Sequence, residues 1–103
     1  MSENVTWGVL EEIARERRRQ MEVEGWTEAH DDRHGDNDLA RAAACYALCD
    51  PETDRVRYSS ITDFVWPWVK EWWKPTTYRR NLIKAGALIV AELERLERAA
   101  RRG

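Results

Sequence analysis

The segment from Gly25 to His34, GWTEAHDDRH, gathers residue types that can do chemistry. It contains both histidines of the chain, three acidic residues, an arginine and a tryptophan. Imidazole and carboxylate groups can ligate a metal ion, transfer a proton or hydrogen-bond a ligand. The segment is therefore a candidate metal site, catalytic site or ligand-binding loop. A polar turn closed by a tryptophan is the alternative without chemistry.

A metal site could be built from His30 and His34, which are four positions apart with Asp31 and Asp32 between them. Histidines at this spacing share a metal ion when they lie on one face of a helix. A glycine stands on either side of these residues, so we do not expect a regular helix there. A metal-dependent nucleotide hydrolase built on these four side chains is kept as an alternative. The sequence itself predicts no metal site and no cofactor.

The search for catalytic residues gives incomplete patterns. An all-α nucleotide pyrophosphohydrolase would bind magnesium through ExxE and ExxD pairs on two helices. Glu28 and Asp31 have the spacing of the second pair, but no ExxE precedes them, and Glu94 and Glu97 lie at the end of the chain. Neither a nucleophile elbow nor a phosphate loop of the P-loop or Rossmann type is present in the sequence. The sequence favours a protein that is not an enzyme and predicts no catalytic residue.

Tryptophan is unusually frequent, with six in 103 residues, and indole rings offer stacking surfaces for a nucleobase. Arg79 and Arg80 follow Pro75 at the expected start of a helix, where phosphate groups are favoured. We therefore predict a nucleotide-type ligand, with Trp26 and Trp73 stacking on the base, Asp32 and His34 bonding ribose or base edges, Lys74, Arg79 and Arg80 holding phosphates, and Arg18 as a further contact. The alternative is that the tryptophans fill the core and the arginines pair with Asp31 and Asp32.

Three helices are expected to position these residues. Apolar side chains at helical spacing predict helices over about 5–24, 38–48 and 77–101, the last of them capped by Thr76 or Thr77. The connection 51–76 is predicted to be irregular and tryptophan-rich, with one or two helical turns in WVKEWWK and a short helix near 60–64. No segment alternates as a strand would. We predict an all-α fold, a small bundle of three main helices forming a single domain over 1–103.

Composition limits the partners. The net charge of −2 is too close to zero to indicate nucleic-acid binding, and no apolar run approaches the roughly 20 residues of a membrane span. Cys45 and Cys49 are expected to be small buried residues in a reducing compartment, so we predict a cytoplasmic protein without membrane attachment. A chain this short can bury only part of its tryptophans and of the apolar stripe on its last helix. We therefore predict a homo-oligomer.

Two segments, RRRQMEVEGWTEAHDDRHGDNDLARAAACYA and WKPTTYRRNLIKAGALIVAELERLER, resemble a family of small uncharacterised helical proteins encoded by phages and prophages. The same segments are also similar in layout to the ryanodine-receptor repeat domain, through Gly25-Trp26, Asp31 or Asp32, His34, Leu39 and Arg80-Asn81. Gly35 replaces the proline that follows the histidine in that domain, and Arg79 replaces its acid. The second resemblance implies a helical module that takes a nucleotide-type ligand.

The phage resemblance implies an accessory protein that acts in the host cytosol. Such a protein can counter host defence by sequestering a nucleotide-derived signal without catalysis, and this is the function we expect. The alternative is an inhibitor that blocks a host enzyme through protein–protein contact. In that case Trp66, Trp68 and Trp72 of the tryptophan-rich connection would be exposed.

Overall fold

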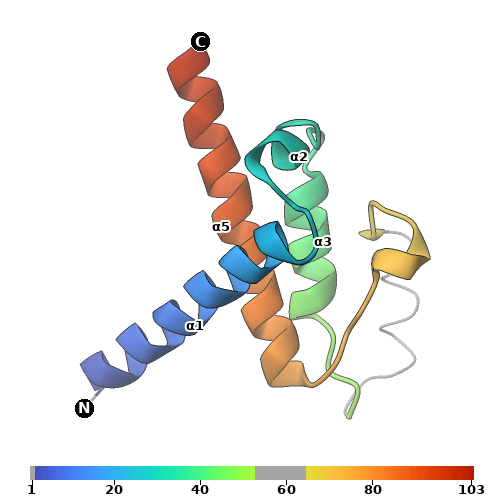
Figure 1. Ribbon diagram of the computed structural model, residues 1–103. Coiled ribbons are helices and arrows are strands. Elements are labelled where there is room, and N and C mark those ends of the chain that lie inside the picture. The colour runs from blue at the N-terminus through green and yellow to red at the C-terminus, as the bar shows by residue number, and fades with distance from the viewer. Residues whose placement is uncertain (1, 53–64) are drawn as a thin grey trace.

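The computed structural model describes residues 2–52 and 65–103, with side chains from Asn4 onward. Its elements are α1 (Ser2–Glu22), α2 (Glu28–Asp32), α3 (Asp38–Ala47), the 3-10 turn η1 (Lys70–Trp72) and α5 (Tyr78–Arg102) (Figure 1). No residue in the described ranges is in a strand, so the predicted all-α bundle is confirmed. The short helix predicted near 60–64 lies outside those ranges. None of the described helices is long and apolar enough to cross a membrane.

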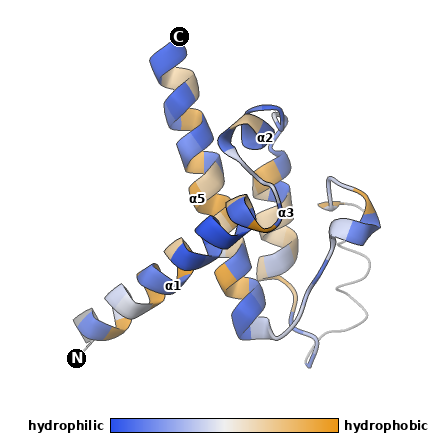
Figure 2. Ribbon diagram, viewed as in Figure 1, coloured by the Kyte–Doolittle hydropathy of each residue, from blue (hydrophilic) through white to orange (hydrophobic). Residues whose placement is uncertain are grey.

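The core lies between α3 and α5, which run side by side (Figure 1). Leu39, Ala42 and Ala43 of α3 are buried against Ala85 and Leu88 of α5. The alanines let the two helix axes approach closely, which suits residues that are small and good helix formers. Figure 2 shows hydrophobic segments on both helices where they lie together.

Tryptophans complete this core from outside the helices, Trp26 from the turn before α2 and Trp66 and Trp73 from the connection before α5. Trp26 and Trp66 are buried, and Trp73 packs with its ring centroid 4.6 Å from Tyr46 and 4.9 Å from Trp66. The alternative prediction, that the tryptophans fill the core, is therefore confirmed for Trp66 and Trp73. Their burial ties the described part of the connection to α3.

The start of α5 follows the predicted chemistry. Thr77 is the N-cap, and its hydroxyl oxygen accepts a hydrogen bond from the backbone N–H of Arg80 at 3.1 Å. A second hydrogen bond at the start of α5 joins Asn81 to Thr76. The side-chain oxygen of Asn81 accepts it from the backbone N–H of Thr76 at 2.8 Å. These bonds satisfy groups that a helix end would otherwise leave unpaired. The predicted start at Thr76 or Thr77 is thereby confirmed.

The expectation that GWTEAHDDRH contains no regular helix was wrong, because α2 occupies its centre. Gly25 has a φ of +76°, which turns the chain so that the N–H of Trp26 donates to the carbonyl of Gln20 at 2.9 Å. Thr27 then caps α2, since its hydroxyl oxygen accepts from the N–H of His30 at 3.3 Å. The turn at Gly25 therefore follows the end of α1 and lets the capped helix α2 begin in a new direction.

Helix α1 crosses α5, and its N-terminal half points away from the other elements (Figure 1). At the crossing, a Cβ on Gly86 would lie 3.0 Å from Cδ1 of Ile13. The group that approaches Gly86 most closely is the Ile13 side chain. Because Gly86 has no side chain, Ile13 of α1 can pack against α5 at this point.

Candidate functional site

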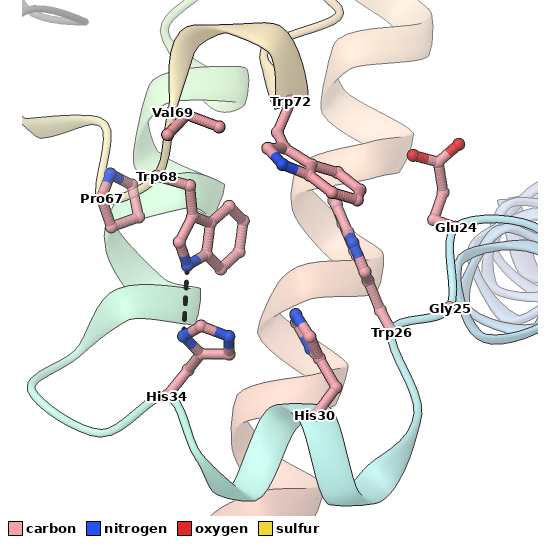
Figure 3. Close-up of a pocket in the computed structure, with 9 residues that line it drawn as sticks. All are labelled: Glu24, Gly25, Trp26, His30, His34, Pro67, Trp68, Val69 and Trp72. Carbon is pink, nitrogen blue, oxygen red and sulfur yellow. Dashed lines mark hydrogen bonds between the residues drawn. The ribbon is translucent and has the colours of Figure 1, made fainter.

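A pocket of about 470 Å³ opens between the segment around α2 and the segment that leads into η1 (Figure 3). We call it the aromatic pocket. It is lined by Glu24, Gly25, Trp26, His30, His34, Pro67, Trp68, Val69 and Trp72. Five of these nine residues carry aromatic rings, which is the lining expected for a site that holds a small, flat or apolar molecule.

The three indoles of the aromatic pocket face it from different directions. The ring centroid of Trp26 is 5.4 Å from that of Trp68 and 6.3 Å from that of Trp72, with interplanar angles of 51° and 43°. Trp26 is buried, while Trp72 is 41% exposed. Trp26 therefore forms the inner wall and Trp72 the rim, so a ligand would meet indole surface at both depths.

The two histidines are in direct contact, with ring centroids 4.3 Å apart. The Nδ1 atom of His30 lies 3.1 Å from Oδ1 of Asp31, and His30 also stacks on Trp26 at an interplanar angle of 8°. A neutral imidazole that donates from Nδ1 to a carboxylate keeps Nε2 as an acceptor. His30 can thus accept a hydrogen bond from a ligand while Asp31 fixes its tautomer.

His34 makes two contacts that compete for one nitrogen. The indole N–H of Trp68 donates to Nδ1 of His34 at 3.2 Å, which requires that this nitrogen carry no proton. Oδ2 of Asp38 lies 3.3 Å from the same Nδ1 and accepts a hydrogen bond only if that nitrogen is protonated. One protonation state cannot satisfy both contacts. Trp68 also packs against Trp26 at 5.4 Å and Trp66 at 5.3 Å between ring centroids, so its hydrogen bond to His34 is one of several contacts that place it on the pocket wall.

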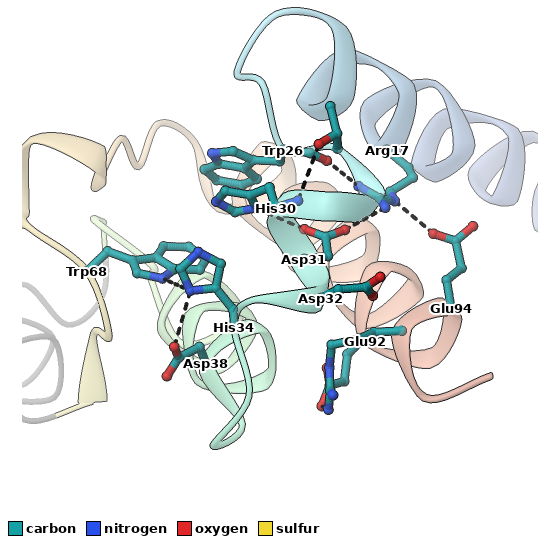
Figure 4. A network of polar contacts seen from close by, with 12 residues as sticks. Arg17, Trp26, His30, Asp31, Asp32, His34, Asp38, Trp68, Glu92 and Glu94 are labelled. Atoms are coloured by element: carbon teal, nitrogen blue, oxygen red, sulfur yellow. Dashed lines mark hydrogen bonds and ion pairs between the residues drawn. The ribbon is translucent and has the colours of Figure 1, made fainter. Parts of the chain in front are cut away.

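A buried polar network supports the pocket from beneath (Figure 4). The guanidinium of Arg17 donates to Oδ2 of Asp31 at 2.7 Å, to the carbonyl of Trp26 at 3.2 Å and to Oε1 of Glu94 at 3.0 Å. The side chains of Arg17 and Asp31 are both buried. Because the network holds the backbone of Trp26 and the carboxylate that orients His30, Arg17 positions two residues of the pocket wall without lining it.

Asp32, which the sequence predicts as a ligand contact, points instead to α5. Arg98 and Arg102 each donate to its carboxylate at 2.8 Å. The hydrogen bond from Arg98, followed by that from Arg102, holds the pKa of Asp32 below its ordinary range. In the described part of the chain, no group of three histidine, cysteine or acidic residues is placed to hold a metal ion. The arrangement of Asp31 and Asp32 thus gives the metal-hydrolase alternative no support.

Three of the predicted ligand residues come together at the aromatic pocket. Trp26 and His34 line it, and Lys74, which is not part of the lining, contacts two residues that are, Glu24 and Trp72. The ammonium group of Lys74 is 3.4 Å from Oε2 of Glu24 and 5.9 Å from the ring centroid of Trp72. Trp73, by contrast, packs in the core next to Tyr46, as described above.

The predicted phosphate-binding arginines lie elsewhere. Arg79 forms a two-point ion pair with Glu12 at 2.6 and 2.8 Å, and Arg80 pairs with Glu16. The hydrogen bond from Arg79 lowers the pKa of Glu12, which keeps that partner ionised. Arg18 lines a separate groove between α1 and α5. The anionic partners that relieve the basic start of α5 are therefore residues of α1.

The predicted site omitted most of the pocket lining, including His30, Trp68, Trp72 and Glu24. The spacing of His30 and His34 carried a signal, but it was read only in terms of metal binding. Trp68 was noted only as an exposed residue of an inhibitory loop, and its indole instead faces His34 from 34 residues away. Nothing in the local sequence marks Glu24 as a pocket residue.

Comparison with models of known families, with curated proteins and with solved structures finds no match to this chain. The phage and ryanodine-receptor resemblances therefore stay predictions.

Proposed function

We propose that the protein binds a small nucleotide-derived molecule in the aromatic pocket and releases it unchanged. The observation that supports this most is the enclosure of about 470 Å³ by three indole and two imidazole rings. That volume is within the range of small-molecule sites, which is about 300–1,000 Å³. A nucleobase is flat and aromatic and carries hydrogen-bonding edges, so it uses both the rings and the histidines.

The base would stack on the indoles at the pocket rim. Stacking of one base on an aromatic side chain contributes about 1–3 kcal/mol. His30 offers an acceptor at Nε2 for an amino or imino group of the base. Lys74 is the one predicted phosphate contact that touches the pocket lining, and it would exchange Glu24 for a phosphate oxygen. We therefore expect the base to contribute more affinity than the phosphate does.

The way the two acids near the pocket are paired supports binding without turnover. Asp31 is held by Arg17 in a buried ion pair, and Glu24 is paired with Lys74 and Arg19. Neither is placed as an isolated general base beside a reacting group. A protein that binds a nucleotide signal in this way would act by sequestering it, which agrees with the anti-defence role implied by the phage resemblance.

A second ligand class is favoured by one observation. A cation, the ammonium group of Lys74, already lies over Trp72 and beside the Glu24 carboxylate. Aromatic residues combined with an acid are the usual means of holding a quaternary ammonium group. A choline-like ligand would take the position of that ammonium group. Glu24→Gln should weaken such a ligand strongly and a nucleoside only slightly.

The inhibitor alternative has less support. It requires Trp66, Trp68 and Trp72 to be exposed together, but Trp66 is buried in the core and Trp68 is only partly accessible. Trp72 alone of the three offers a large exposed ring.

A thermal-shift screen tests the proposed function. The panel holds nucleosides, their phosphates, ADP-ribose derivatives, cyclic oligonucleotides, choline-type cations and divalent metals, and mass spectrometry then checks each compound. A ligand at about 100 times its Kd stabilises the protein by about 2.7 kcal/mol, or several degrees for a chain of this size. Recovery of an intact nucleotide-type ligand supports the proposal. Consumption of the ligand, or no shift with any nucleotide derivative, overturns it.

Matched aromatic variants locate the binding. Trp72→Ala removes the pocket rim, and Tyr78→Ala removes a ring at the start of α5 that is similarly exposed, at 44% against 41%. Both sites are accessible enough for alanine to leave the fold intact. We expect Trp72→Ala to weaken nucleoside binding about tenfold or more, which corresponds to loss of one stacking contact. Equal affinity in the two variants would place the site elsewhere.

A further inference from the structure

We infer that an exposed apolar face on α1 and α5 is the interface of a two-fold symmetric homodimer. This inference is independent of the proposed ligand. The α1–α5 face consists of Trp7, Leu10, Leu82, Ile89, Leu93 and Leu96, all of which are exposed in the single chain. Exposed apolar side chains are common individually, but a contiguous group of large ones marks an interaction surface.

The residues on α5 are spaced as a helix-pairing seam. Leu82, Ile89 and Leu96 are seven residues apart, and Leu93 falls between the last two at the other position of the heptad. This a/d spacing keeps apolar residues in contact with a partner helix over several turns. The sides of α5 that carry Ala85, Leu88 and Ala91 are already buried in the core of this chain. Between Leu82 and Ile89 the seam position is Gly86, where Ile13 of α1 packs, so the part from Ile89 to Leu96 is the part available to another helix.

Helix α1 gives a second reason to expect a partner. Every side chain from Asn4 to Glu11 is exposed, and this part of the helix extends away from the body of the protein (Figure 1). Isolated helices shorter than about 12–15 residues are marginal in water. Trp7 and Leu10 lie on this extension, so their burial by a partner would supply the packing that the extension lacks.

We take the partner to be a second copy because one surface offers both projecting side chains and a groove. Leu93 and Leu96 project, and the groove of about 300 Å³ is lined by apolar residues that include Leu10, Met21 and Val90, together with the charged residues Arg17, Arg18 and Glu94. In a two-fold interface the same surface of each copy meets the other, so the projections of one copy would enter the groove of its partner.

The area is sufficient for a stable dimer. The six side chains are roughly half exposed, so each leaves about 100 Å² open to water. The face therefore offers about 600 Å² per copy, or about 1,200 Å² per dimer. The latter area is at the lower end of the range for specific interfaces. Val5 and Val9, which are also exposed on α1, add to this area.

Sedimentation equilibrium over a range of protein concentrations, with three proteins, tests the inference. They are the wild type, Leu93→Asp on the face, and Leu48→Asp at the end of α3, where the leucine is 55% exposed against 60% for Leu93. We expect a dimer for the wild type and for Leu48→Asp. In Leu93→Asp a carboxylate would be buried at the interface, and we expect the dimer Kd to rise about 100-fold or more. A monomeric wild type, or a dimer with the same Kd in Leu93→Asp, would overturn the inference.

Hydrogen exchange separates dissociation from unfolding. In the dimer the amides of the α1 extension should be protected, and in Leu93→Asp they should exchange rapidly while those of α3 stay protected. If the Leu93→Asp monomer protected the extension as well as the wild type does, the extension would not need a partner. That result would also refute the inference.

Discussion

Replacement of Arg17 by methionine should test how the polar network holds the aromatic pocket. Arg17 and Asp31 are both buried, with Nη2 and Oδ2 2.7 Å apart. Methionine fills much of the arginine volume but leaves the carboxylate without the guanidinium. Removing one partner of a buried ion pair costs about 3–5 kcal/mol, and the lost bond to the carbonyl of Trp26 adds about 1 kcal/mol. We expect a loss of about 4–6 kcal/mol, a large part of the 5–15 kcal/mol typical of a small domain.

The assay is urea unfolding at neutral pH followed by circular dichroism, with the free energy of unfolding extrapolated to water. Arg15→Met is the control, because Arg15 lies on the same helix outside the groove and its side chain is 67% exposed. We expect this control to stay within about 0.5 kcal/mol of the wild type. The two variants remove the same side chain from the same helix and differ in burial.

A double variant identifies the cause of the loss. Arg17→Met combined with Asp31→Asn removes both charges, and asparagine can still accept the hydrogen bond from His30. We expect the double variant to recover at least about half of the stability that Arg17→Met loses, because the unpaired charge is gone. If Arg17→Met lies within about 1 kcal/mol of the wild type, or the double variant is no more stable than the single one, the reasoning is refuted.

Three further changes test other parts of the structure. Burial opposes ionisation of Glu16, but its hydrogen bond and ion pair with Arg19 outweigh this and lower its pKa below the ordinary value of 4.5. Glu16 therefore stabilises the fold above that pH, and the stability lost in Glu16→Gln, about 1–3 kcal/mol in urea unfolding, should vanish as the pH falls through the lowered pKa. Burial raises the pKa of Cys45 to about 11, so a disulfide reagent at mildly alkaline pH should label it only after unfolding, and immediate labelling would contradict its core position. Gly86→Ala should change the melting temperature little, because a gain of about 1 kcal/mol in helix propensity offsets the crowding of Ile13. Gly86→Leu should destabilise the protein by about 1–3 kcal/mol, because the larger side chain cannot fit against Ile13. Equal melting temperatures for the two variants would show that α1 shifts at the crossing to make room.

The elements that could be predicted are those specified by neighbouring residues. The last helix has a capping threonine after a proline and a continuous apolar stripe, so its start at Thr77 follows from local chemistry. Helix α2 was missed because the flanking glycines were given more weight than Thr27. The hydroxyl of Thr27 provides the first hydrogen bond of a five-residue helix, and a stretch that short has no apolar periodicity to detect.

The predicted phosphate site illustrates what local reasoning cannot supply. Arginines at the start of a helix oppose the helix dipole and need an anion. The sequence suggested a ligand or the acids of GWTEAHDDRH, whereas the structure provides Glu12 for Arg79, from 67 residues away, and Glu16 for Arg80, from 64 residues away. Which acid meets which arginine depends on how α1 crosses α5, and no local pattern encodes that crossing.

Arg17 connects the two proposed binding events. On one side its guanidinium holds the backbone of Trp26 and the carboxylate of Asp31, and on the other its side chain lines the groove of the α1–α5 face. A ligand that fixes Trp26 and a second copy that fixes α1 would therefore restrict the same side chain. Linkage requires that any change that dimerisation makes to ligand affinity be matched by an equal change that the ligand makes to dimer affinity. We expect both affinities to increase together in the wild type and to become independent in the Arg17→Met, Asp31→Asn double variant, as measured by ligand titration above and below the dimer Kd. Persistent coupling in the double variant would show that the connection runs through other residues.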